Sequence, residues 1–175
     1  MYFRRNTALA LSALVLAAPA LSSCGFNYAT DIDYTPAAGV HNRDAVVDVL
    51  GAVVVSAQDG SGTFIASLSN NDQREPMTFD FLAGSGGTTL TAEEFEAISI
   101  ARGGFVNLAE EGGIELTGEF GAGDFVPLTV GFGNGERVTL QVPVVDDSGI
   151  YDGLDSSGNP ADDEDDAATI DEAGE

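Results

Sequence analysis

The side chains that could bind a soft metal ion are few in this sequence of 175 residues: it contains one cysteine (Cys24), one histidine (His41) and two methionines, Met1 and Met77. Copper and similar ions need imidazole, thioether or thiolate ligands that the fold brings together. His41 precedes the first expected strand and is better explained as a solvated linker residue. Met77 begins an alternating apolar run, so it is better explained as a core residue than as a copper ligand. We therefore expect no metal site and no cofactor.

Acidic residues are abundant, with 29 in the sequence, and carboxylate oxygens suit calcium. Their spacing does not form a defined site. The Asp31-x-Asp33 pair continues into Tyr-Thr-Pro without the glycine that a calcium loop requires. The alternate-residue pattern of an EF-hand loop is also absent from the acids near the C-terminus, Asp152, Asp155, Asp162 and Asp163. A diffuse, weak cation atmosphere is the expectation.

The usual groups of hydrolytic catalysis are missing. A serine nucleophile needs a base and an orienting acid, but the one histidine precedes the expected domain and no G-x-S-x-G elbow is present. The paired acids Glu93-Glu94 and Glu110-Glu111 would point to opposite faces of a strand, which favours solvated surface charge. Gly131-x-Gly133-x-Gly135 lies at an expected hairpin tip with no helix after it, so it is no phosphate cradle. We predict that the protein is not an enzyme.

Composition bounds the class of protein. A chain with 43% hydrophobic residues has enough apolar material for one domain with a core. All six basic residues are arginine and the formal net charge is -23, so nucleic acid would repel the chain. A single cysteine excludes a disulfide framework within the chain.

Residues 1–23 have the pattern of an export signal, in which Arg4 and Arg5 precede an apolar run over residues 8–21. This run is shorter than the ~20 residues of a membrane-spanning helix. Leu21-Ser22-Ser23-Cys24 resembles the bacterial lipobox, which implies lipidation of the Cys24 thiol and cleavage just before it. We expect a lipoprotein held in the cell membrane by its lipid and facing outside the cytoplasm, exported by the general secretory route rather than the twin-arginine route. A free or buried cysteine after an ordinary signal peptide is the alternative.

The rest of the chain divides into three parts. Residues 24–43 have no sustained period of 2 or 3.6 and are predicted to form the lipidated tether. Residues 44–145 contain about eight short runs rich in Val, Phe, Ile and Thr between Gly, Asn and Asp clusters, which is typical of an all-β domain. Such strands pair most economically into a single antiparallel β-sandwich of the cupredoxin or immunoglobulin type. Residues 146–175 hold 12 carboxylates and no basic residue, so a disordered acidic tail is expected.

Three segments inside the domain give local predictions. Residues 126–132 and 138–144 alternate apolar and polar residues around Asn134-Gly135, which predicts a β-hairpin with a tight turn. Gly51, within a long apolar run, predicts a bulge or a bend. Residues 91–100 fit either a short capped helix or a strand, and both alternatives stay open.

Segments distributed along the chain carry a family resemblance: Cys24, Tyr34-x-Pro36, and residues 39–43, 44–56, 125–132 and 138–145. Together they resemble actinobacterial lipoproteins that are distant relatives of the periplasmic PCu(A)C copper chaperones. The resemblance covers about residues 24–146 and implies a cupredoxin-like β-sandwich on the outer face of the membrane.

The chaperone family binds Cu(I) through two histidines and two methionines, and this sequence has no second histidine and, after cleavage, no second methionine. We therefore hypothesise a non-enzymatic surface lipoprotein that binds a protein or envelope partner and has lost the copper site. A periplasmic or extracellular copper chaperone is the alternative.

Overall fold

A computed structural model describes residues 38–158, in which ten strands are joined by turns and one turn of 3-10 helix. Cys24, the expected signal peptide and residues 159–175 lie outside the described residues, so those predictions stay predictions. Among residues 38–158, no helix is long and apolar enough to cross a membrane. The elements are β1 (Val40–Asn42), β2 (Val47–Gln58), β3 (Ser61–Asn70), β4 (Met77–Gly84), β5 (Leu90–Ala92), β6 (Ile98–Ile100), β7 (Phe105–Asn107), β8 (Ile114–Gly118), β9 (Phe125–Phe132), β10 (Arg137–Asp146) and η1 (Gly149–Tyr151).

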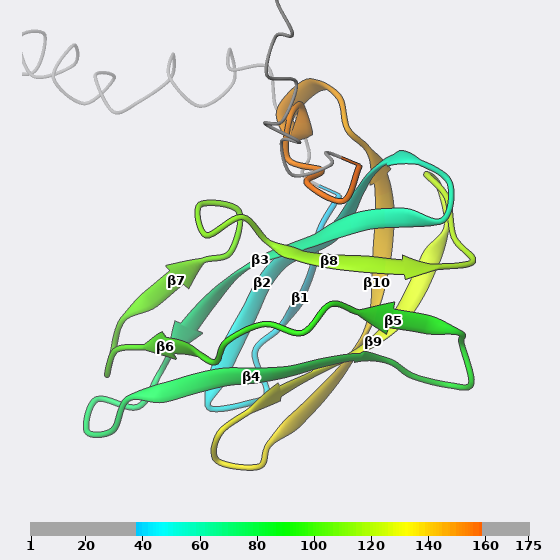
Figure 1. Cartoon of the computed structure of the whole chain (residues 1–175). Helices are drawn as coiled ribbons and strands as arrows, with labels where there is room; N and C mark the ends of the chain where they lie inside the picture. The colour runs from blue at the N-terminus through cyan, green and yellow to red at the C-terminus, as the bar shows by residue number, and fades with distance from the viewer. Residues whose placement is uncertain (1–37, 159–175) are drawn as a thin grey trace, which may run out of the picture. The chain divides into compact units, whose positions relative to one another are not determined.

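The strands form two layers that β10 joins into one curled sheet (Figure 1). The first layer has the order β5-β8-β3-β2, with β1 on β2 and β7 on β3. The second has the order β10-β9-β4-β6. Because each strand buries one face, the two layers pack their apolar faces together. The predicted all-β sandwich is confirmed.

The sequence analysis predicted a purely antiparallel sandwich, but the structure contains one parallel pair of strands. β10 leaves β9 and its end, Val144 to Asp146, runs parallel to Val54 to Ser56 of β2. The paired residues are 90 positions apart in the sequence, since Val144 lies opposite Val54. Alternation within a strand reports which face is buried but not which distant strand lies beside it, so this pairing left no local signal.

The predicted hairpin is confirmed in β9 and β10, which pair with Leu128 opposite Leu140. The tight turn is also present, and Gly135 supplies its positive φ. The Gly135 N–H donates to the Phe132 carbonyl over 2.8 Å, and Gly135 has a φ of 85°. The loop is therefore of the three-residue type, which needs glycine at its left-handed position.

The predicted irregularity at Gly51 is also confirmed. Gly51 has a φ of 62°, and the register of β2 against β3 shifts between Leu50 and Val53. The bulge divides this strand of 12 residues into a first part that pairs with β1 and a second part that pairs with β10.

The open segment at residues 91–100 adopts strands. Leu90–Ala92 pairs with β8 and Ile98–Ile100 pairs with β4, so one short connection crosses from the first layer to the second. Phe95 in this connection stacks on Phe79 with ring centroids 4.9 Å apart. The strands that the sequence analysis missed are β1 and β5, each of three residues.

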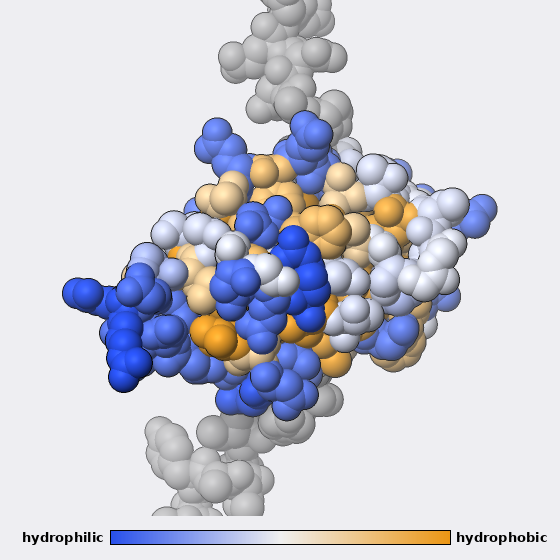
Figure 2. Space-filling view, turned by 90° about the horizontal axis from the view of Figure 1, so that it is seen from below, coloured by the Kyte–Doolittle hydropathy of each residue, from blue (hydrophilic) through white to orange (hydrophobic). Residues whose placement is uncertain are grey.

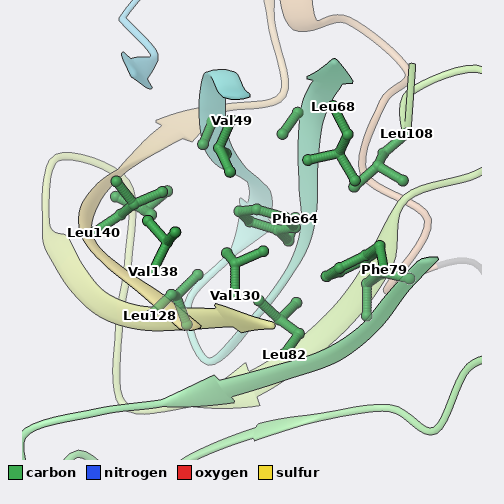
Figure 3. Close-up of a cluster of buried hydrophobic side chains, with 14 of the residues drawn as sticks. Val49, Phe64, Leu68, Phe79, Leu82, Leu108, Leu128, Val130, Val138 and Leu140 are labelled. Carbon is green, nitrogen blue, oxygen red and sulfur yellow. The ribbon is translucent and has the colours of Figure 1, made fainter. Parts of the chain in front are cut away.

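The core between the layers is a single cluster of Val, Leu, Ile and Phe side chains contributed by both layers. Figure 3 shows Phe64 and Leu68 of β3 facing Val130 of β9 and Leu82 of β4. Phe64, Phe79 and Phe132 are fully buried. Each Å² of apolar surface buried in this core contributes about 25 cal/mol to the free energy of unfolding. The core therefore stabilises the domain without a disulfide.

Two predicted boundaries are corrected. β1 lies within residues 24–43, which were predicted to be a tether, and it pairs with β2. Residues 146–158 were predicted to be disordered, but they fold back on the domain. Charge alone suggested disorder. The tail's apolar Tyr151 and Leu154 provide the buried contacts that offset the cost of ordering.

We expect Phe79→Ala to lower the free energy of unfolding by about 3–5 kcal/mol, because it removes a buried ring on which Phe95 stacks. The matched control is Phe105→Ala, since Phe105 is 72% exposed and its loss changes stability by less than about 0.5 kcal/mol. Urea denaturation followed by circular dichroism measures both. Equal losses in the two variants would contradict the placement of the core.

Candidate functional site

His41 lies on β1 rather than in a linker, which corrects the expectation for this residue. Its side chain is exposed, and its Nδ1 accepts a hydrogen bond of 2.9 Å from the Gly51 N–H. Gly39 allows this approach, because a Cβ there would collide with the backbone of Gly51. The imidazole therefore caps the bulge of β2, and in its neutral form the proton lies on Nε2.

Met77 fills the core, as predicted. It is 8% exposed and starts β4, opposite Ile100 of β6. Met77 lines the same shallow hollow as Val46. His41 instead bonds Gly51, which follows Val46 by five residues on the same segment of chain. Five extended residues span roughly 16 Å. The structure thus does not bring His41 and Met77 together.

Oxygen and nitrogen ligands likewise do not gather. Within residues 38–158, no group of three or more His, Cys, Asp or Glu side chains is placed to hold a metal ion. Asp152 and Asp155, which the sequence analysis weighed as calcium ligands, lie on the segment that folds back on the domain.

This C-terminal segment, residues 147–158, is called the strap. It covers the outer face of the first layer, where Tyr151 and Leu154 pack on a second apolar cluster of Val53, Val55 and Ile65. The Tyr151 hydroxyl accepts a hydrogen bond of 3.1 Å from the Ala38 N–H. The strap thus closes a sheet face that would otherwise expose branched aliphatic side chains.

Asp155 fixes the strap to the sheet. Its carboxylate accepts hydrogen bonds from the Ala57 N–H over 2.7 Å and from the Thr63 hydroxyl over 2.9 Å. Thr63 is fully buried, and its Oγ1 also accepts from the Ser156 N–H over 2.8 Å. Burial alone would raise the pKa of Asp155, but hydrogen bonds from Ser157, Ala57 and Thr63 outweigh it and hold the pKa below its ordinary value.

An acidic surface adjoins the strap, and we define it by Glu93, Glu94, Glu111 and Glu115, which line one shallow hollow. Partial burial raises the pKa of the Glu115 carboxyl, and the charges of Glu93 and Asp155 add to this rise. Sequence reasoning singled out Glu93 and Glu94 but missed Glu115. Its signal was the alternation with Ile114 and Leu116, which are buried and leave Glu115 on the outer face.

The surface as a whole mixes polar and apolar residues. Figure 2 shows one face of the domain, on which apolar residues lie between hydrophilic ones rather than in one continuous patch. The most exposed large apolar side chains are Phe105, Phe125 and Ile150, at 72%, 66% and 55%.

No protein family profile matches the sequence, and no curated protein matches it either. Solved structures do. The copper-bound PCuAC domain from PmoF2 is 15% identical, with a TM-score of 0.50, and the match covers 61% of this chain and 98% of that domain. The apo PCuAC domain from PmoF2 is 11% identical, with a TM-score of 0.49, over 63% of this chain and 98% of that domain. The apo PCuAC domain from PmoF1 is 12% identical, with a TM-score of 0.49, over 60% and 98%.

The likeness at a TM-score of 0.50 places this chain among proteins with the PCuAC fold. It agrees with the family resemblance in the sequence as far as architecture goes. At 15% identity the likeness concerns the fold alone.

We expect Asp155→Asn to lower the free energy of unfolding at pH 7 by about 1 kcal/mol, because an amide cannot accept from both Ala57 and Thr63. A depressed folded-state pKa stabilises the fold above the ordinary pKa of aspartate, and this contribution disappears as the pH falls through the folded-state value. The difference in stability between the variant and the parent should therefore shrink as the pH falls below the ordinary pKa of aspartate.

Glu115→Gln is the matched control with the opposite sign. A raised folded-state pKa means that the charge of Glu115 opposes folding at pH 7, so its removal gives a small gain in stability that also vanishes in acid. Urea unfolding at pH 7 and pH 3 measures both variants. Stabilisation by Asp155→Asn at pH 7 would contradict its role in holding the strap.

Proposed function

We propose that this protein is a lipid-anchored, non-enzymatic binding protein of the bacterial cell envelope that serves a protein or envelope partner instead of copper. The observation that carries the proposal is the placement of its soft donors on a PCuAC-like fold. His41 accepts from the Gly51 N–H, and Met77 is buried in the core. The sequence holds no further histidine. Two separate donors give a soft ion no shared site.

The anchor in this proposal is Cys24, which follows the apolar run of residues 8–21. Several acyl chains on one residue exceed the threshold for stable membrane attachment, since each buried methylene contributes about 0.8 kcal/mol. Cleavage before Cys24 would leave 13 residues between the lipid and residue 38. The domain would then act at the outer surface of the membrane.

The buried polar side chains of the domain have structural hydrogen bonds. Ser56 Oγ donates to the backbone near the β2–β3 turn, Asn70 Nδ2 donates to the Glu75 and Ala101 carbonyls, and Thr63 bonds the strap. Every buried side-chain nitrogen or oxygen in the described part of the chain has a hydrogen-bond partner.

Copper delivery is the second candidate function, and one observation favours it: the PCuAC domain from PmoF2 that shares this fold is described as copper-bound. A copper role here would need ligands from His41 or Met77, because the sequence has no other imidazole and only Met1 as a second thioether.

Cu(I) titration of the full chain against a chromogenic competitor separates the two candidates. We expect an affinity weaker than micromolar that His41→Ala and Met77→Leu leave unchanged. Met77→Leu preserves the core volume, so it costs less than about 1.5 kcal/mol and keeps the fold. Tight binding that either substitution abolishes would establish the copper candidate.

The anchor is tested in a bacterial host that acylates lipoproteins. We expect the parent chain to sediment with membranes and to carry a mass increase of several acyl chains on an N-terminal Cys24, whereas Cys24→Ala is released to the soluble fraction. Mass spectrometry of the purified polypeptides measures this. An unmodified N-terminus in the membrane-bound parent would refute the anchor.

Crosslinking on intact cells then tests partner binding, and failure to recover any partner would refute that part of the proposal.

A further inference from the structure

The outer face formed by β9, β10 and residues 81–84 of β4 is unusual in this acidic protein because its outward side chains include no carboxylate. We call it the acid-free face and define it by the outward residues Phe81 of β4, Phe125 and Thr129 of β9, and Arg137, Thr139 and Gln141 of β10. Asp80 lies at its rim, beside Gly133. The strap packs on the outer face of the first layer and therefore does not cover the acid-free face.

The absence of acids here departs strongly from the rest of the domain. Residues 38–158 contain 19 aspartates and glutamates against four arginines. One of those four, Arg137, lies on the acid-free face. The face therefore offers no carboxylate to a strongly basic partner, and an uncharged partner can meet it without a change in electrostatic energy.

One end of the face is a fixed stack. The Arg137 guanidinium lies over the Phe81 ring, 4.7 Å from its centroid. Gly131 stands between them, and a Cβ there would come within 2.5 Å of the guanidinium carbon. Arg137 Nη1 donates to the Phe132 and Glu136 carbonyls over 3.2 and 3.0 Å. These bonds fix the position of the guanidinium next to the sheet.

The middle and the other end of the face are polar and aromatic in turn. The Thr129 and Thr139 hydroxyls bond each other across β9 and β10 at 3.1 Å. The exposed amide of Gln141 follows Thr139 along β10, and Phe125, 66% exposed, ends the row on β9. From Gly131 to Phe125 the strand covers about 20 Å.

We propose that the acid-free face binds a neutral oligosaccharide, with Phe125 and the Arg137–Phe81 stack contacting sugar rings and the hydroxyl and amide groups between them bonding sugar hydroxyls. The proposal rests on the proposed envelope-binding function and names its surface and ligand class. Aromatic and guanidinium planes pack on the apolar faces of sugar rings, and a row about 20 Å long matches a chain of a few sugars.

Size and charge disfavour a second copy of this chain as the occupant. Three strands about 4.8 Å apart and 20 Å long give roughly 300 Å², whereas a stable protein interface buries about 800 Å² on each partner. A second copy would also bring its own formal charge of -23. A neutral glycan needs less area and carries no charge.

The test uses the full chain in detergent with chitotetraose and cellotetraose as neutral probes and tetragalacturonate as the anionic comparison. We expect isothermal titration to detect at least one neutral probe at micromolar to millimolar affinity, and Phe125→Ala to weaken it at least tenfold. The matched control is Phe105→Ala, which removes a similarly exposed aromatic on β7, outside the acid-free face. Its affinity should equal that of the parent.

Several results would overturn the proposal: no binding of either neutral probe at 10 mM, equal binding by Phe125→Ala and the parent, or tetragalacturonate binding as tightly as the neutral probes. Self-association in sedimentation that Phe125→Ala abolishes would assign the face to a second copy instead. The copper titration is scored separately. Tight copper binding together with Phe125-dependent sugar binding would reject the proposed function and keep the sugar site.

Discussion

Membership of one strand in both layers is the constraint on which this fold depends. β10 pairs with β9 along most of its length and then with β2 at its end, so it fixes the two sheets relative to each other without a disulfide. The inward side chains of β10, Val138, Leu140, Val142 and Val144, are buried in one core cluster with residues of both layers. Its outward residues belong to the acid-free face, and its end leads into the strap. Stability, candidate binding surface and C-terminal order thus converge on one element.

Local patterns in the sequence predicted what local physics controls. The alternation around Asn134-Gly135 predicted the hairpin, and Gly51 predicted the bulge, since both depend on the conformation of neighbouring residues. The patterns could not predict the parallel β2–β10 pair, because its partners are far apart in the chain. They also failed for Asp155. Its charge suggested a solvated tail, whereas the buried Thr63 hydroxyl and the Ala57 N–H give that carboxylate specific partners.

The candidate site followed the same division. The apolar alternation that begins at Met77 was enough to assign this residue to the core. His41 was misjudged as a linker residue, since its role depends on the bulge of another strand. The acid-free face carries no motif at all. It emerges only when β4, β9 and β10 are laid side by side, which brings Phe81, Gly131 and Arg137 into one row.

The hydrogen bond from the Ala38 N–H to the Tyr151 hydroxyl places the start of the ordered chain beside the strap. Both ends of the ordered chain lie at the pole where β10 finishes, and the β9–β10 turn lies at the opposite pole, about 30 Å away for a strand of ten residues. The two ends of the acid-free face therefore lie at different distances from the start of the ordered chain. Phe125 lies nearer to that start, whereas the Arg137–Phe81 stack lies near the β9–β10 turn, so a polymer running along the face would extend from one pole of the domain toward the other.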